Sequence, residues 1–272
     1  MREWNAGTYH RISDPLYDLG LAVLARLPLN GDETVVDLGC GTGRLTKELA
    51  DRLPRGRVLA LDRSANMLAV AGPYLAMNAG REISARGTWA GAHVSLVRAD
   101  ASALPLERSV DAIFSTATLH WVLDHPRLFA SIHAALKPGG RFVAQCGGGP
   151  NVERLRGRVA SLLQEEGFSS ARERFRNPWN FADAETTATR LRDAGFIEVQ
   201  TSIESTPIVQ RDADAFREFI RHVVCGPYLA AMSDDAQRSL FVERLTTLAA
   251  ADDPPFELDY WRLNMAARRS QG

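Results

Sequence analysis

The stretch that decides the fold is Val35-Val36-Asp37-Leu38-Gly39-Cys40-Gly41-Thr42-Gly43 (VVDLGCGTG), followed at once by a helical pattern from Arg44. An apolar run leads into three glycines at alternate positions, which predicts a buried strand, a ligand-binding loop and a helix with free N–H groups at its start. Gly39 and Gly41 lack a Cβ where a ligand would pass close to the backbone, and Gly43 allows the helix to begin tightly against the strand.

This loop departs from two common nucleotide-binding patterns. A dinucleotide fingerprint requires GxGxxG, and counting from Gly39 or Gly41 places Arg44 or Thr46 at the last glycine. No Gly-Lys-Ser/Thr follows the loop, so the Walker pattern is absent as well. A nicotinamide oxidoreductase and a phosphate-transfer enzyme are therefore disfavoured.

Short β-branched runs alternate with helical patterns along most of the chain, which predicts an α/β fold with a doubly wound, mostly parallel sheet. The five expected parallel strands are Thr34–Leu38, Arg57–Asp62, Val94–Ala99, Ala112–Ser115 and Arg141–Cys146. The expected helices between them are Arg44–Leu53, Asn66–Leu75 and Pro126–Leu136, the last ended by Lys137-Pro138-Gly139-Gly140, with a loop over Asn78–Ala92.

The remaining chain predicts two further strands, making seven, and a helical insertion between them. The expected elements are helices over Val152–Glu166, over Asp183–Ala194 between an Asp183 cap and Gly195, and over Asp212–Ala251, and strands over Phe196–Ser202 and Phe256–Asn264. The predicted division is a lid segment (1–30), a core (31–211 and 252–272) and a helical cap (212–251).

Composition restricts the class of protein. The 272 residues are 45% hydrophobic, and 32 Lys and Arg oppose 33 Asp and Glu for a net charge of -1, so no global field favours nucleic acid or an anionic membrane. Cys40, Cys146 and Cys225 show no CxxC spacing, which favours a reducing, cytoplasmic setting. Neither a signal peptide, a long apolar run nor a compact metal-ligand spacing is evident in the sequence, so a soluble, metal-free protein is expected.

Two carboxylates follow predicted strands. Asp62 closes the second strand about 20 residues after the loop, where doubly wound folds place a carboxylate that accepts ribose hydroxyls. Asp100 follows the third strand. Because the carboxyl ends of parallel strands share one sheet edge, both should lie beside the glycine loop; capping of the next helix is the other interpretation of Asp62.

Together these segments resemble the class I S-adenosylmethionine-dependent methyltransferases over residues 32–147. The matching stretches are VVDLGCGTGR, LALDRS, ADASALPL, DAIFSTATLHW and LKPGGRFV. The resemblance implies that Gly39 and Gly41 meet the methionine part of the cofactor, Asp62 the ribose, and Asp100 with Ala101 the adenine, while Asp37 orients the loop or reaches the amino group through water. The cofactor residues that it implies are Asp37, Gly39, Cys40, Gly41, Asp62, Arg63, Met67, Asp100, Ala101, Thr116 and Trp121.

A closer resemblance is to trans-aconitate methyltransferases and malonyl carrier-protein methyltransferases, which esterify carboxylates. It lies in Trp4-Asn5, Tyr9, Leu119-His120-Trp121-Val122, Gln145 and Asn180-Phe181. It implies O-methylation of a small-molecule or carrier-bound acid. The glycines that follow Gln145-Cys146 and the helical insertion match no substrate motif.

The acceptor side rests on three candidate residues. His120 follows the fourth strand and is interpreted as a base, as a donor to the acceptor oxygen, or as a ring packed beside Trp121. Tyr9 and Trp4 either belong to a lid that contacts substrate or lie in a helix packed on the sheet. Carbon or phenolic-oxygen methylation with His120 as base, and a non-catalytic cofactor-binding regulator, remain alternatives.

Overall fold

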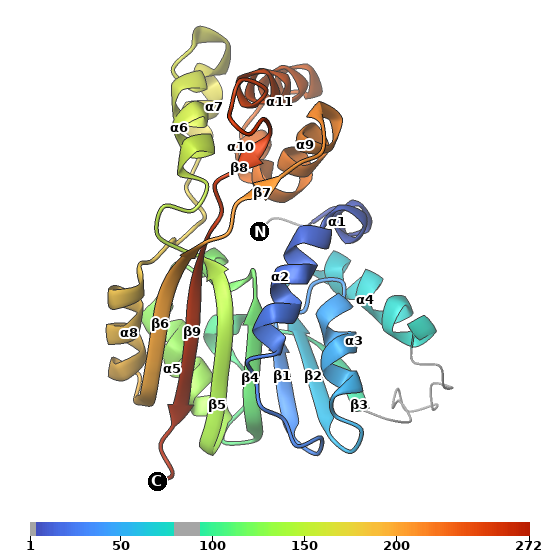
Figure 1. Ribbon diagram of the computed structural model, residues 1–272, viewed down its shortest axis with the longest axis vertical. Helices are drawn as coiled ribbons and strands as arrows, with labels where there is room; N and C mark the ends of the chain where they lie inside the picture. The colour runs from blue at the N-terminus through green and yellow to red at the C-terminus, as the bar shows by residue number, and fades with distance from the viewer. Residues whose placement is uncertain (1–3, 79–92) are drawn as a thin grey trace.

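The computed structural model describes residues 4–78 and 93–272 (Figure 1), and the loop expected over Asn78–Ala92 lies, after its first residue, outside the described residues. Within this described part, seven strands form one sheet in the order β3-β2-β1-β4-β5-β9-β6. Their bounds are β1 (Thr34–Leu38), β2 (Arg57–Asp62), β3 (His93–Arg98), β4 (Val110–Thr116), β5 (Leu136–Gly147), β6 (Phe196–Ser205) and β9 (Trp261–Arg269).

The first five strands are parallel, as predicted, and β9 runs antiparallel between β5 and β6. In register, Val36 of β1 lies between Leu59 of β2 and Ile113 of β4. The doubly wound, mostly parallel sheet is confirmed, with β1 and β2 at their predicted bounds.

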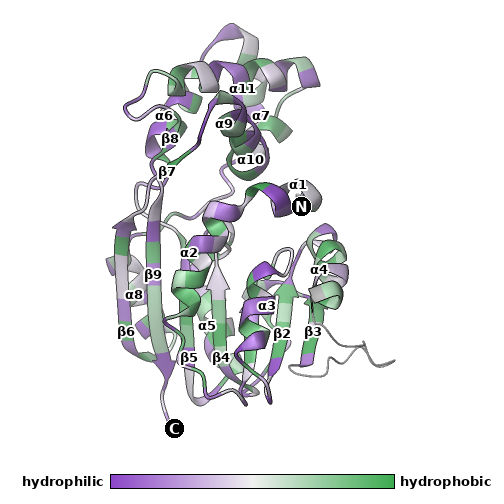
Figure 2. Ribbon diagram, turned by 45° about the vertical axis from the view of Figure 1, so that its right-hand side comes forward, coloured by the Kyte–Doolittle hydropathy of each residue, from purple (hydrophilic) through white to green (hydrophobic). Residues whose placement is uncertain are grey.

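Helices cover both faces of the sheet. The helices are α1 (Ala6–Ile12), α2 (Asp14–Leu24), α3 (Arg44–Asp51), α4 (Ala65–Asn78), α5 (His125–Ala135), α6 (Glu153–Leu162), α7 (Ser169–Arg174), α8 (Ala184–Asp193), α9 (Ala213–Phe219), α10 (Gly226–Ala230) and α11 (Asp235–Ala249). Helices α5 and α8 share a buried cluster with one face, and α2, α3 and α4 share another with the opposite face. Figure 2 shows apolar residues along inner parallel strands such as β2, as expected for strands covered on both sides, whereas β6 and β9 carry more polar residues.

The helical cap lies beyond the carboxyl ends of the parallel strands (Figure 1). Its apolar cluster joins α9, α10 and α11 with α6 and α7, which come from the segment between β5 and α8. A short antiparallel pair, β7 (Ile208–Val209) and β8 (Glu257–Leu258), joins the two chain segments that lead to and from α9–α11. The predicted division had placed α6 and α7 in the core; the division itself stays a prediction.

Three predicted elements need correction. Strand β5 begins at Leu136 instead of the predicted Arg141, so it includes Lys137–Gly140. The helix before it ends at Ala135, one residue from its predicted end, because proline disfavours helical geometry at the residue before it. The helix expected over Asp212–Ala251 is broken after a π-helical turn, at Gly226-Pro227, and again where Asp234 caps α11. The strand expected over Phe256–Asn264 is divided between β8 and β9.

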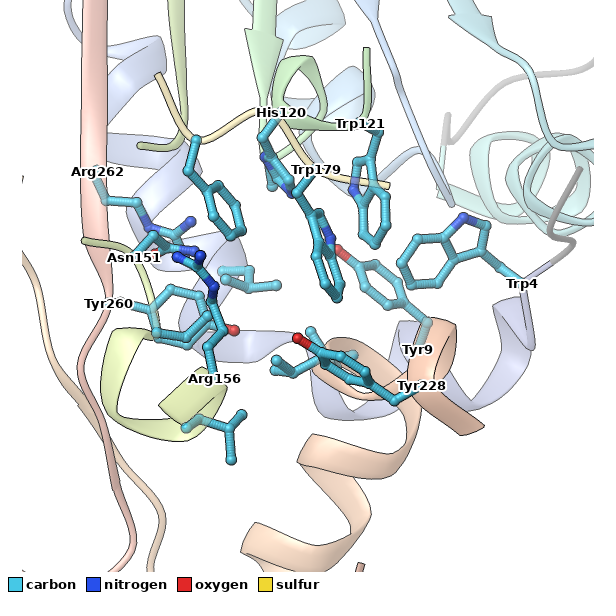
Figure 3. Close-up of a pocket in the computed structure, with 17 residues that line it drawn as sticks. Trp4, Tyr9, His120, Trp121, Asn151, Arg156, Trp179, Tyr228, Tyr260 and Arg262 are labelled. Atoms are coloured by element: carbon cyan, nitrogen blue, oxygen red, sulfur yellow. The ribbon is translucent and has the colours of Figure 1, made fainter. Parts of the chain in front are cut away.

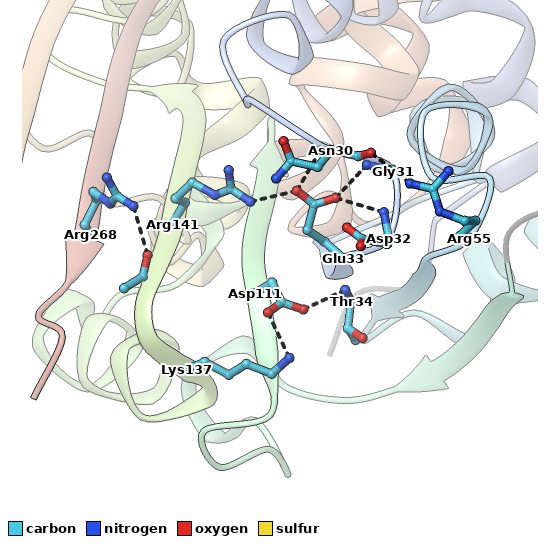
Figure 4. Close-up of polar contacts among 11 residues, drawn as sticks. Asn30, Gly31, Asp32, Glu33, Thr34, Arg55, Asp111, Lys137, Arg141 and Arg268 are labelled. Atoms are coloured by element: carbon cyan, nitrogen blue, oxygen red, sulfur yellow. Dashed lines mark hydrogen bonds and ion pairs between the residues drawn. The ribbon is translucent and has the colours of Figure 1, made fainter.

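Polar contacts of a buried glutamate connect the loop before β1 to β5 near the amino ends of the strands (Figure 4). Glu33, which is 6% exposed, accepts hydrogen bonds from the N–H groups of Asn30 (2.8 Å) and Gly31 (2.9 Å) and from the Arg141 guanidinium (3.0 Å). Burial alone would raise the pKa of Glu33, but these donors together lower it to about 2. The loop before β1 is thereby held to β5, at the edge opposite the cap.

Candidate active site

The glycine loop connects β1 to α3, and all three of its glycines have positive φ. A Cβ on Gly39 would lie 2.1 Å from Thr118 Oγ1, whereas a Cβ on Gly41 would meet open space. A Cβ on Gly43 would press on Leu75 and Ala71 of α4 at 3.2–3.3 Å. Gly39 therefore permits close packing with the loop after β4, Gly43 permits packing against α4, and Gly41 leaves room beside the loop; contact of Gly39 and Gly41 with a ligand stays a prediction.

The two predicted carboxylates lie at the carboxyl ends of β2 and β3. Asp62 accepts hydrogen bonds from the Gly41 N–H (2.9 Å) and the Ser64 N–H (2.8 Å), so it fixes the loop as well as facing the cavity. Asp100 accepts from the hydroxyl and the N–H of Ser102, which, with Arg63 3.6 Å away, lower the pKa of Asp100. Asp100 is therefore held as a carboxylate.

A cavity of about 420 Å³ opens between the glycine loop and these carboxylates. Nine of the predicted cofactor residues line it: Gly39, Gly41, Asp62, Arg63, Met67, Asp100, Ala101, Thr116 and Trp121. Its volume is in the range of small-molecule sites, and it combines two carboxylates with an apolar lining. These residues fit a nucleoside, because carboxylates accept from ribose hydroxyls and apolar side chains cover a base.

Asp37 and Cys40, the other two predicted cofactor residues, line a smaller cavity of about 70 Å³ next to the same loop. Asp37 accepts a hydrogen bond from the Thr46 hydroxyl at 2.6 Å, and burial raises its pKa to about 7. Burial also raises the pKa of the Cys40 thiol well above its usual range, so this thiol is not a reactive nucleophile.

A third cavity, of about 60 Å³, lies between the strand ends and the cap (Figure 3). It shares Trp4, Tyr9, Ala117 and Trp121 with the large cavity, and we call it the acceptor cavity. Its walls are strongly aromatic, and all three predicted acceptor-side residues line it. The aromatic and histidine side chains that line it are Trp4, Tyr9, His120, Trp121, Trp179, Phe181, Tyr228 and Tyr260.

Arg262 of β9 is the most unusual group in the acceptor cavity, and sequence reasoning missed it. The residue is only 3% exposed, and its guanidinium lies 4.3 Å from the centre of the Tyr260 ring. Its Nε and Nη2 atoms have no hydrogen-bond partner among the residues that the structure describes. Among the described residues, no carboxylate lies within 4.0 Å of it, the limit for an ion pair. Burial lowers the pKa of Arg262, although a guanidinium stays protonated near neutral pH.

A second cation, Arg156 of α6, lines the same cavity. Its guanidinium lies 5.5 Å from the centre of the Phe181 ring, and its charge acts on the Tyr228 hydroxyl. In the sequence, Arg156 lies between Arg154 and Arg158 in a run of alternating arginines. No local pattern distinguishes this arginine from its neighbours, because α6 must first fold over the strand ends.

His120 lies in the turn after β4 and is 8% exposed. Its Nδ1 accepts a hydrogen bond from the Gly147 N–H at 3.2 Å. Burial, with the charge of Arg262 adding to it, lowers the pKa of His120 to about 3. The ring is therefore neutral at pH 7, and because Nδ1 accepts, Nε2 carries the proton and is a donor.

Trp4 and Tyr9, at the start of the chain, lie at the junction of the two cavities. The two rings pack edge to face with their centres 5.6 Å apart, and the Trp4 ring makes a similar contact with Trp121 at a centre-to-centre distance of 5.4 Å. Nearby, His10 Nδ1 lies 2.8 Å from the hydroxyl of Thr42 in the glycine loop. Helix α1 is thereby joined to both cavities, as a lid segment would be.

In the described part of the chain, no helix is long and apolar enough to cross a membrane.

Comparisons with known proteins identify the family of this chain. Residues 36–144 match the family described as "Methyltransferase domain". The chain is 31% identical to the trans-aconitate 2-methyltransferase of Variovorax paradoxus, over 89% of this chain and 88% of that protein. It is 30% identical to the trans-aconitate 2-methyltransferase of Deinococcus radiodurans over the same shares.

Among solved structures, phosphoethanolamine N-methyltransferase 2 of Haemonchus contortus, bound to phosphomonomethylethanolamine and S-adenosylhomocysteine, superposes with a TM-score of 0.60. It is 23% identical, and the match covers 98% of this chain and 57% of that chain, so it shows the fold. The chain therefore belongs to the class I S-adenosylmethionine-dependent methyltransferases, and its similarity to members named trans-aconitate 2-methyltransferase extends over most of its length.

Proposed function

We propose that this methyltransferase esterifies a carboxylate of a small acid that binds through Arg262. The observation that carries the proposal is the buried guanidinium with two unpartnered atoms at the wall of a cavity that adjoins the nucleoside-sized one. Burying a charge without a partner costs several kcal/mol, and an anionic ligand in the cavity would offset that cost. A carboxylate matches the planar, forked geometry of a guanidinium.

The charge of the acceptor cavity supports an anionic acceptor. Two arginines line it, and none of the described residues that line it is acidic. A cationic acceptor would be repelled by both guanidinium groups in a setting that excludes water and strengthens the repulsion. The name of the two relatives, trans-aconitate 2-methyltransferase, refers to a carboxylic acid and agrees with this charge.

The chemistry asks little of the protein beyond binding and positioning. S-adenosylmethionine, when bound, supplies a methyl group already activated by a sulfonium sulfur. A carboxylate acceptor is ionised at pH 7 and needs no base, so Arg262 holds it and the aromatic walls exclude water. The ester group that forms is neutral and makes no ion pair with Arg262, which favours release of the methylated group.

The state of His120 argues against the alternative in which it acts as a base on a carbon or phenolic acceptor. Its Nδ1 already accepts a hydrogen bond, and a pKa of about 3 makes the imidazole a weak base. Its Nε2–H instead suits donation to an acceptor oxygen. Carrier-bound acids stay a prediction from the sequence resemblance and belong in the same test.

The test is a transfer assay with labelled S-adenosylmethionine and a panel of trans-aconitate, citrate, malonate, a malonyl carrier protein and a phenol. We expect label in a free acid, released by mild base because esters hydrolyse where ethers and C-methyl groups do not. Arg262→Met should lower kcat/KM at least about 30-fold, while the matched control Arg244→Met, at an exposed ion pair with Glu165, should not. Base-stable label, or an Arg262→Met enzyme as active as the wild type, would refute the proposal.

A further inference from the structure

Tyr9 occupies a place in the molecule that sets it apart from the other tyrosines. It lines the acceptor cavity, the large cofactor cavity and the small cavity beside Asp37. Tyr228 and Tyr260 also line the acceptor cavity, but neither of them lines the other two cavities. Figure 3 shows the Tyr9 side chain extending from α1 into the acceptor cavity with its hydroxyl toward Trp179. The phenol thus lies where the two reactants must approach each other.

The surroundings of the Tyr9 hydroxyl make it a hydrogen-bond donor. Burial raises the pKa of Tyr9 to about 12, with the charge of Arg262 lowering it and that of Asp62 raising it. The hydroxyl therefore lies in the fields of both the acceptor-side cation and the cofactor-side carboxylate, and it keeps its proton at neutral pH. Within the described residues, no hydrogen bond joins it to another group. Its O–H is available to a ligand.

We propose that the Tyr9 hydroxyl is the second donor to the acceptor carboxylate, opposite Arg262, and that the pair turns one carboxylate oxygen toward the cofactor cavity. This inference rests on the proposed function, because it concerns the same bound acid. A carboxylate offers about four lone-pair positions, and one cationic partner leaves it free to rotate. A second donor from another element fixes the plane of the group and the direction of the remaining lone pair.

The position of Tyr9 on the lid segment gives this donor a further consequence. Helix α1 is held over the cavities by the contacts of Trp4 with Trp121 and of His10 with Thr42. Arg262, in contrast, lies on β9 of the sheet and does not depend on the lid. The carboxylate receptor is therefore complete only while α1 covers the site, so acid binding and lid closure favour each other.

The test compares Tyr9→Phe with the wild type and with Tyr74→Phe, a hydroxyl deletion on α4 outside the three cavities. The probe is the panel acid that the wild type esterifies fastest. Calorimetry measures its affinity for protein free of cofactor, and separately the affinity for S-adenosylmethionine. A hydrogen bond to a charged group corresponds to about a 10- to 100-fold change in affinity, which is the expected loss of acid affinity and of kcat/KM in Tyr9→Phe. Cofactor affinity should stay within about twofold.

A second variant separates the hydroxyl from the packing of the lid. Trp4→Phe keeps the Tyr9 hydroxyl and weakens the contact with Trp121, so it should lower the affinities for acid and cofactor together. If Tyr9→Phe binds and esterifies the acid as the wild type does, the inference is wrong while the proposed function stands. If the wild type esterifies no acid of the panel, the proposed function itself fails.

Discussion

Replacing Arg262 by methionine should stabilise the protein while removing its activity. The guanidinium is buried with two unpartnered atoms, so the folded protein holds a desolvated charge that only a ligand can compensate. Methionine has a similar length, fills irregular space and carries no charge. The variant thereby separates the contribution of Arg262 to ligand binding from its contribution to folding.

The magnitude follows from the contacts of the side chain. Each unpartnered buried donor costs about 1–3 kcal/mol, and the contact with the Tyr260 ring returns about 0.5–2 kcal/mol. Two such donors cost about 2–6 kcal/mol together, so the net expectation for Arg262→Met is a gain of up to about 5 kcal/mol, centred near 3 kcal/mol, in the free energy of unfolding. For 272 residues, a gain of about 3 kcal/mol raises Tm by roughly 5 °C.

The assay is urea and thermal unfolding of both proteins without ligands, followed by the same scans with the acid substrate. The acid should raise the Tm of the wild type by mass action and leave that of the variant unchanged. The reasoning is refuted if the variant loses 1 kcal/mol or more of stability without ligand. In that case the guanidinium has hydrogen-bond partners in the ligand-free protein and stabilises the fold, and it does not depend on an acceptor for compensation of its charge.

Three further outcomes are expected. Asp62→Ala should lower S-adenosylmethionine affinity at least about 30-fold in calorimetry, because it removes a predicted ribose acceptor and the carboxylate that accepts from the Gly41 N–H. Asp51→Ala, at an exposed carboxylate, is the control. Equal cofactor affinities of Asp62→Ala and the wild type would contradict the proposed cofactor site. Glu33→Gln should lower the free energy of unfolding at pH 7 by up to about 3 kcal/mol. The pKa of Glu33 in the folded protein is about 2, below the ordinary 4.5, so this contribution to stability is present above pH 4.5 and is lost as the pH falls toward 2. Urea titrations at pH 7 and pH 3 should show a smaller difference in the free energy of unfolding between wild type and variant at pH 3. An equal difference at both pH values would contradict the prediction. At saturating cofactor, kcat/KM for the acid should stay flat from pH 6 to 9. His120→Ala should keep its cofactor affinity and have about a tenfold lower kcat. An inflection in kcat/KM near pH 6.5 that disappears in His120→Ala would show that the histidine is a base.

The elements nearest the glycine loop were predictable because their signals are local. Residues 34–38 and 57–62 alternate with helical patterns at βα spacing, and parallel strands place their carboxyl ends at one edge. This geometry brings Asp62 and Asp100 to the large cavity, as predicted. The predictions that failed depend on how neighbouring elements divide the chain, as over Asp212–Ala251, where Gly226-Pro227 and the Asp234 cap break the expected helix.

The acceptor cavity was not predictable in the same way. Arg262 lies in a strand whose local pattern shows nothing unusual, and it becomes buried because β9 inserts between β5 and β6, with Gly147 and Glu204 as its neighbours in register. Arg156 belongs to a run of arginines of which Arg154 and Arg158 form ion pairs. Sequence spacing could not tell which arginine of the run faces the cavity.

The sequence by itself thus determined the doubly wound sheet, the glycine loop and the carboxylates beside it, because periodicity and strand order fix those positions over short distances. Only the tertiary structure decided the acceptor side. The cap closes over the strand ends through packing between α6–α7 and α9–α11, which are far apart in the chain, and that closure removes water from Arg262. Burial of a charge is a property of the whole fold, and no local pattern of residues determines it.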